Sequence, residues 1–221
     1  MKRTSVSLFA AFLAIALLSG MSAARAQDYY MDLHIGYNMV DSGDLEYDTG
    51  SISTGYEQRA AFGGSFGYVD PGGFRIESEM TFRSNDINYI DTFNAKGQLT
   101  SFSAMINMFY ELQIGSGSGY AYSLGSESPF RPYIGVGAGG VRYTLDAAVD
   151  LAAADIIDDT TYGLAYQGIL GLGVEVTEST LVTLDFRYIV SENVKFRDVA
   201  GAKFKVDSNQ ATAMFGLRST F

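Results

Sequence analysis

The chain has 221 residues, with 25 Asp and Glu against 15 Lys and Arg, a formal net charge of −10 and no Cys. The acidic balance argues against a nucleic-acid partner, because phosphates require a basic face, and without Cys we expect neither disulfides nor a lipoprotein anchor. The 25 Gly, 15 Tyr and 15 Phe, beside only 3 Pro and no Trp, favour many short strands over helices.

The N-terminal segment has the pattern of a secretory signal. Two basic residues follow the first Met, an apolar run extends over residues 6–18, and residues 24–26 have the A-x-A form of a cleavage site. A retained anchor is the weaker alternative, because the run is shorter than the roughly 20 apolar residues of a transmembrane helix. We therefore expect residues 1–26 to be removed as a signal peptide and residues 27–221 to form the mature domain.

Alternation of side chains with a period of two predicts the strands of the mature domain. In residues 29–39, Leu33 and Ile35 share one face with tyrosines and methionines, whereas Asp32 and His34 lie on the other. Eight segments show this alternation: 29–39, 60–69, 74–82, 101–114, 131–143, 162–176, 181–190 and 210–221.

The last of these segments, residues 210–221, poses the central choice between two kinds of protein. Phe215, Leu217 and Phe221 lie on one face, and the other face is small or polar and includes Arg218. A secreted, soluble, lipocalin-like barrel would turn the apolar face inward. A transmembrane barrel would turn it towards lipid and leave the polar face in the lumen.

The connections favour the membrane alternative because their lengths alternate. We expect long polar loops at 40–58, 84–99, 144–161 and 191–209, and connections on the other rim at 70–73, 115–128 and 177–180. Long outer loops and short periplasmic turns are typical of outer-membrane barrels, and an open sheet edge could not be satisfied in lipid. The predicted fold is all-β: an eight-stranded antiparallel up-and-down transmembrane β-barrel.

Within residues 131–143, Gly135, Gly137 and Gly139 recur at every second position. A glycine stripe on one face of a strand lets a neighbouring backbone or a bulky side chain approach closely. We expect a bulge at Gly139-Gly140 that shifts the alternation and turns Val141 and Tyr143 outward. A phosphate-binding loop is not expected, because no helix follows the glycines.

With its signal sequence, the chain resembles bacterial outer-membrane β-barrel proteins of the surface-antigen and Omp25-like superfamily, whose barrels are of the OmpA type. Residues 132–140 and 171–175 are similar to glycine-rich strands of these families. The resemblance implies a Gram-negative outer-membrane location. It also implies that Phe215, Leu217 and the terminal Phe221 form the signal read by the barrel-assembly machinery.

Charged residues on the inward faces predict a lumenal network. We expect acidic side chains to be satisfied there by arginines, because buried charges need partners. The candidate residues are Asp32, Arg75, Glu77, Glu79, Glu111, Asp185, Arg187 and Arg218, with His34, Arg83, Asn107 and Gln167 on the same faces. The network is either a plug, because an eight-stranded barrel is just wide enough to be filled by its own side chains, or the gate of a narrow pore.

The predicted function is that of a non-enzymatic surface protein with a largely plugged lumen and a structural, antigenic or adhesive role. The alternative is a small-solute porin with a gated pore. An outer-membrane enzyme is the weaker alternative, because the only His, His34, lies on an inward face away from the outer rim. We expect no cofactor or metal. The expected partners are outer-membrane lipid and lipopolysaccharide, the assembly machinery, and host surface molecules reached by the outer loops.

Overall fold

The computed structural model describes residues 29–40, 44–47, 50–91, 93–112, 129–149, 155–192, 194–206 and 209–221. Within these residues, every named element is a β-strand. The described part of the chain contains no helix long and apolar enough to cross a membrane. The predicted signal peptide, residues 1–26, and the start of the predicted mature domain at residue 27 lie outside the described residues.

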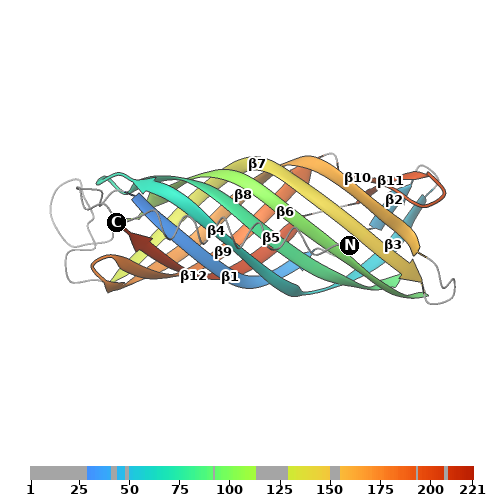
Figure 1. Cartoon of the computed structure of the whole chain (residues 1–221), viewed down its shortest axis with the longest axis horizontal. Helices are drawn as coiled ribbons and strands as arrows, with labels where there is room; N and C mark the ends of the chain where they lie inside the picture. The colour runs from blue at the N-terminus through green and yellow to red at the C-terminus, as the bar shows by residue number, and fades with distance from the viewer. Residues whose placement is uncertain are drawn as a thin grey trace, which may run out of the picture.

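Eight strands form a closed antiparallel ring (Figure 1). Each strand pairs with the next along the ring, and the last pairs with the first through a register that places Leu33 opposite Leu217. In ring order the strands are β1 (Tyr29–Val40), β4 (Arg59–Val69), β5 (Phe74–Ile90), β6 (Phe93–Glu111), β7 (Phe130–Val149), β8 (Asp155–Thr177), β9 (Thr180–Glu192) and β12 (Gln210–Thr220). The predicted eight-stranded antiparallel barrel is confirmed.

Four further strands make a small sheet at the barrel end opposite the C-terminus (Figure 1). They are β2 (Asp44–Tyr47), β3 (Gly50–Glu57), β10 (Lys195–Arg197) and β11 (Lys203–Val206). The sheet runs in the order β10, β11, β2, β3 and joins the barrel where β3 pairs with β5. The prediction that residues 40–58 and 191–209 are loops is therefore wrong for these stretches, which fold into a cap.

The barrel wall is taller on one side. Strands β5 to β8 have 17, 19, 20 and 23 residues, whereas β1, β4, β9 and β12 have 11 to 13. The strands β5 and β6 continue to a tight turn, with Ile90 paired to Phe93 and Asp91 at a φ of 55° between them. The predicted loops 84–99 and 144–161 are thus largely strand, and the pairing of their backbone groups explains why these polar segments are ordered.

The outward face of the ring strands carries the apolar residues, as expected for a surface in contact with lipid. Ile35, Val136 and Leu170 are each about 60% exposed. At the end near the C-terminus, the Tyr29 ring lies 5.8 Å from Phe66 and 5.5 Å from Tyr68. These outward aromatic rings lie at the barrel end where the termini of β1 and β12 meet, which is where an interfacial girdle is expected.

The polarity of the two faces inverts along the tall strands. On β7, Ile134 and Val136 point outward, yet further along the strand Tyr143 and Leu145 are buried inside while Asp146 is exposed outside. The side chains keep their faces throughout this stretch, because the pairing of β7 with β6 continues without a shift.

The expected bulge at Gly139-Gly140 is therefore absent, and its predicted consequence is wrong. Met105 pairs with Gly139 and the next residues pair in sequence. Val141 is 4% exposed and Tyr143 is 1% exposed, so both side chains point inward. The inversion of polarity therefore does not come from a bulge, because strand β7 stays regular at this point.

An apolar core fills the barrel at the capped end. Its buried members come from the tall strands, from β9 and from the cap: Leu45, Ile87, Ile90, Ala95, Leu99, Met105, Val141, Tyr143, Leu145, Ala147, Ile157, Ala165, Ile189, Val194, Phe196, Phe204 and Val206. Tyr56 of β3 packs against this core, and burial raises the pKa of its hydroxyl because the phenolate would be poorly solvated. The cap is thus bound to the barrel by burial of apolar surface.

Candidate functional site: the barrel lumen

The lumen is the candidate site because charged side chains from five ring strands meet in it. All eight residues of the predicted network point inward, and seven of them are at most 4% exposed. The eighth, Glu111, has a side chain that is 13% exposed. Side-chain parity along the strands places these residues on the inward face, and the contacts below show how they are joined.

Two arginines share one carboxylate at the end of the lumen nearest the C-terminus. Arg75 Nε lies 3.1 Å from Glu111 Oε1, and Arg218 lies 3.5 Å from the same oxygen. The second partner of Arg218 is Asp32, at 3.4 Å. This end of the lumen therefore contains two guanidinium groups and two carboxylates in one cluster.

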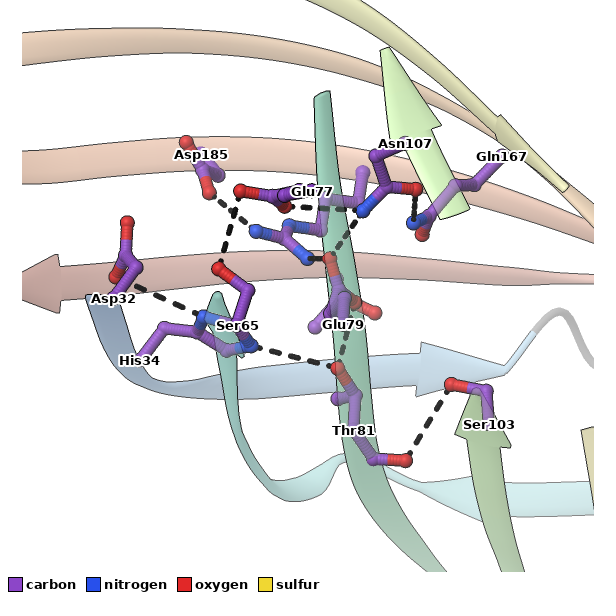
Figure 2. Close-up of polar contacts among 12 residues, drawn as sticks. Asp32, His34, Ser65, Glu77, Glu79, Thr81, Ser103, Asn107, Gln167 and Asp185 are labelled. Atoms are coloured by element: carbon purple, nitrogen blue, oxygen red, sulfur yellow. Dashed lines mark hydrogen bonds and ion pairs between the residues drawn. The ribbon is translucent and has the colours of Figure 1, made fainter. Parts of the chain in front are cut away.

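Further along the lumen, Arg187 bridges two acids. Its guanidinium contacts Glu79 through one nitrogen and donates to Asp185 Oδ2 at 2.7 Å through another. Glu79 is fully buried and also accepts a hydrogen bond from Thr81 at 2.7 Å. Figure 2 shows Glu79 at the centre of these contacts, with Thr81 and Asn107 on either side.

Neutral donors satisfy Glu77, contrary to the expectation that arginines satisfy every acid. Tyr30 donates to Glu77 Oε2 at 2.7 Å, Ser65 donates to the same oxygen at 3.1 Å, and Asn107 donates to Oε1 at 3.1 Å. Asn107 also donates to Glu79 at 2.7 Å, so its amide joins the two carboxylates. Its own oxygen accepts from Gln167 at 2.7 Å (Figure 2).

Aromatic rings surround the two arginines, and they were absent from the predicted network. The Arg75 guanidinium carbon lies 4.4 Å from the Phe109 ring centroid and 4.8 Å from that of Tyr133. Arg218 lies 5.0 Å from the Tyr30 ring centroid. Tyr133 also donates to Asp185, which links this cluster to the Arg187 bridge. Alternation along the strands could have placed both tyrosines inside. Tyr30 lies on the same strand face as Asp32, and Tyr133 lies on the same face as the glycine stripe.

The glycines make room for these rings. A Cβ atom on Gly135 would meet the Phe109 ring, and one on Gly171 would meet the ring of Tyr133. A Cβ on Gly137 would collide with the side chain of Asn107. The expected close approach is confirmed, and the space that the glycines leave is filled by protein.

A polar layer of Arg83, hydroxyl and amide side chains separates the ion-paired network from the apolar core. Arg83, on the same face of β5 as Glu79, donates to Ser103 at 2.8 Å and to Thr212 at 3.3 Å. Nearer the capped end than Arg83, Asn38 donates to Asn85 at 2.6 Å and accepts from Thr212 at 2.7 Å. Along β5 the inward side chains thus change from charged to amide and then to the isoleucines of the apolar core.

The only His of the chain lies within the lumen. His34 is 3% exposed, with Nε2 3.4 Å from the Thr81 hydroxyl and Nδ1 3.9 Å from Asp32. Figure 2 shows the ring between Asp32 and Thr81. Among the described residues, no group of three or more His, Asp or Glu side chains is arranged to hold a metal ion.

The predicted assembly signal lies on the lipid-facing surface. Phe215, Leu217 and Phe221 are between 45% and 56% exposed and share one face of the barrel. The backbone amide of Phe221 donates to the carbonyl of Tyr29 at 3.0 Å, so the C-terminus is fastened to the first strand. The recognition of these residues by an assembly machinery stays a prediction.

Comparisons with known proteins point to one family. Residues 10–218 match the family model described as outer membrane protein beta-barrel domain. Neisserial surface protein A has a similar fold, with a TM-score of 0.51 and 15% identity over 87% of this chain and 97% of that chain. OprG from Pseudomonas aeruginosa gives a TM-score of 0.58 and 16% identity over 89% and 98%, respectively. No curated protein matches the sequence significantly.

Proposed function

From the premise that this chain belongs to the outer membrane protein beta-barrel domain family, we propose that it is a non-enzymatic surface protein whose lumen is closed to solutes. The protein is located in the outer membrane. The observation that carries the proposal is that inward side chains of the described residues are buried at successive heights, from the arginines near the C-terminus to the apolar core at the capped end. A barrel of eight strands has little interior volume beyond that of its own side chains.

The charged network supports closure because its members hold one another in place. Arg187 is 2% exposed and contacts two carboxylates. Asn107 is fully buried and forms hydrogen bonds with Glu77, Glu79 and Gln167. Buried ion pairs of this kind are costly to separate, at about 3–5 kcal/mol when one partner is removed. A solute crossing this layer would have to displace them.

The apolar core supports closure at the other end for a different reason. Leu99, Leu145 and Phe196 are at most 2% exposed and belong to the buried apolar cluster at the capped end. Hydrated ions do not cross such a layer, because their transfer from water to an apolar region is strongly unfavourable. The lumen therefore has two closures of different chemistry in series.

A gated small-solute porin is the second candidate, and the bridge at Arg187 favours it. This guanidinium contacts both Glu79 and Asp185, so it could keep one partner while releasing the other. Such a switch would open the charged layer only. The apolar core at the capped end would also have to move, which is why closure is our first proposal.

In this proposal, function resides on the surface. The surrounding lipid and lipopolysaccharide contact the outward face, and the capped end supplies the surface available to host molecules and antibodies. The lipid-facing residues Phe215, Leu217 and Phe221 would serve earlier, as the signal for the assembly machinery. Enzymatic activity forms no part of the proposal, because the single His is enclosed in the lumen.

Conductance across a planar bilayer tests the proposal. We expect no discrete openings from the folded, inserted protein at any moderate voltage. The variant Arg187→Ala/Arg218→Ala should also remain silent, because the apolar core stays in place. Discrete openings in the natural protein that change in this variant would contradict closure and establish the porin. Heat-modifiable migration on a detergent gel verifies folding in both samples.

A further inference from the structure

Four basic side chains lie on one face of the hairpin formed by β10 and β11, in the cap. They are exposed, and between them along the strands Phe196 and Phe204 point into the apolar core. We call this surface the basic hairpin face; its residues are Lys195, Arg197, Lys203 and Lys205. It is unusual in a chain whose formal net charge is −10.

The register of the hairpin sets like charges opposite one another. Lys195 pairs with Lys205, and Arg197 pairs with Lys203. Directly opposed residues have Cβ atoms about 5 Å apart, and like charges at this distance are destabilising. None of the four forms an ion pair with another described residue.

Other features hold the hairpin together in spite of this repulsion. At its turn, Gly201 has a φ of 87°, and Asp198 accepts a hydrogen bond from the backbone amide of Ala202 at 2.8 Å. Phe196 and Phe204 stack with ring centroids 5.9 Å apart. The turn and the apolar face therefore stabilise the hairpin without ion pairs from the four bases.

A hollow of about 390 Å³ lies beside the basic hairpin face. It is lined by Asp159, Thr160, Lys195, Phe196, Arg197 and Lys203. The carboxylate of Asp159 is engaged with the backbone, because it accepts hydrogen bonds from the amides of Thr160 at 2.8 Å and Arg197 at 2.7 Å. Three basic side chains therefore line the hollow, and Asp159, the only acidic residue among its lining residues, already accepts hydrogen bonds from the backbone.

The hollow begins where the lipid-facing surface of β8 ends. The outward side chains of β8 are apolar or glycine from Val176 up to Tyr162, and the next two outward residues are Thr160 and Asp158. Thr160 lies two residues beyond Tyr162, which is about 7 Å along a strand. The basic hairpin face is therefore adjacent to the depth at which the head groups of the surrounding lipid lie.

We propose that the basic hairpin face binds the phosphate groups of lipopolysaccharide in the surrounding outer leaflet. Phosphate oxygens would relieve the repulsion between the opposed bases through charge-assisted hydrogen bonds, and the hollow would receive the adjoining sugar. The nearness of the hollow to the lipid-facing surface favours this source over a soluble sulfated glycan. The inference rests on the proposed function in one respect, the orientation of the capped end towards the cell exterior.

The test compares two double variants of the full protein purified in detergent from outer membranes. Lys195→Gln/Lys203→Gln removes two bases of the hollow. The control, Arg59→Gln/Arg131→Gln, removes two exposed bases that are paired with acids elsewhere: Arg59 lies 2.5 Å from Asp86 and Arg131 lies 2.8 Å from Glu175. The probes are purified lipopolysaccharide, the same material after enzymatic removal of its phosphates, and heparin.

We expect the natural protein and the control to bind phosphorylated lipopolysaccharide equally. The hairpin variant should bind it about tenfold more weakly, as the loss of two charge contacts implies, and the dephosphorylated material should bind weakly to all three proteins. Equal binding by the hairpin variant, or binding that ignores the phosphates, would overturn the proposal. Heparin binding that depends on the hairpin bases, without lipopolysaccharide binding, would overturn the lipid assignment. Conductance is a separate measurement, so failure here leaves the closed lumen unaffected.

Discussion

Arg187 offers the most direct test of the lumenal network. We predict that Arg187→Met lowers the free energy of unfolding by about 3–5 kcal/mol, the usual cost of removing one partner of a buried ion pair. The size follows from burial: Glu79 is fully buried and Asp185 is 4% exposed, so water cannot replace the lost guanidinium. The substituted Met would keep most of the side-chain volume, so the loss reports charge more than packing.

A double-mutant cycle separates the ion pair from packing. Glu79→Gln removes the charge and keeps one of the two oxygens that accept from Asn107 and Thr81. With that oxygen towards Asn107, the new amide nitrogen can donate to the Thr81 hydroxyl. With Glu79 already neutral, Arg187→Met leaves only Asp185 without its cation. The double variant should therefore be more stable than the sum of the two single losses predicts, by about 1–3 kcal/mol.

Equilibrium unfolding by urea in lipid vesicles measures these losses, followed by circular dichroism because the chain has no Trp. The control is Arg131→Met, since the pair of Arg131 with Glu175 is partly exposed, with the arginine side chain 44% accessible. Solvent screening limits its loss to about 0–1 kcal/mol. A loss from Arg187→Met no larger than that of the control, or additive losses in the cycle, would refute the reasoning.

Two further predictions use matched positions on β7. Gly135→Ala should lower the free energy of unfolding by about 1–3 kcal/mol, because the new Cβ meets the buried Phe109 ring. Gly140→Ala should change it little, because nothing lies within 4 Å of the Cβ there. Thermal gel-shift curves compare the two variants, and equal midpoints would contradict the filled lumen. Val136→Arg, on the lipid-facing surface, should lower the free energy of unfolding by about 2–4 kcal/mol. Asp146→Arg, on the same face beyond the polarity inversion, should leave refolding into vesicles unchanged. A comparable loss at both positions would show that the inversion does not mark the membrane boundary.

The ring strands could be predicted because side-chain alternation depends only on position along the chain. Asp32, Glu79 and Arg218 were assigned to the lumen by parity, and all three are buried there. Their partners could not be predicted in the same way. Arg187 meets Glu79 across 108 residues of sequence, and only the register of the closed ring decides which side chains share a height in the lumen.

Two features of the interior were missed for a physical reason. Parity placed Tyr30 on the inward face, but neither Tyr30 nor Tyr133 was included in the predicted network, although both rings are buried beside the arginines. The cation–π contacts and hydroxyl hydrogen bonds that hold them depend on the glycines of neighbouring strands. The tall parts of β5 to β8 were assigned to loops because their sequences are polar or acidic. In the structure they are strands whose apolar side chains lie inside the barrel.

The inversion of polarity connects the fold to the proposed function. Where lipid surrounds the barrel, apolar side chains such as Val136 are used on the outside, so the interior is left with polar residues that must satisfy one another. Where water surrounds it, Asp146 takes the outside and Leu145 the inside, as in a soluble protein. Both arrangements fill the interior, one with ion pairs and one with an apolar core. The apolar core at the capped end also packs against the cap. The proposed closure of the lumen and the proposed binding by the basic hairpin face would therefore both depend on this core.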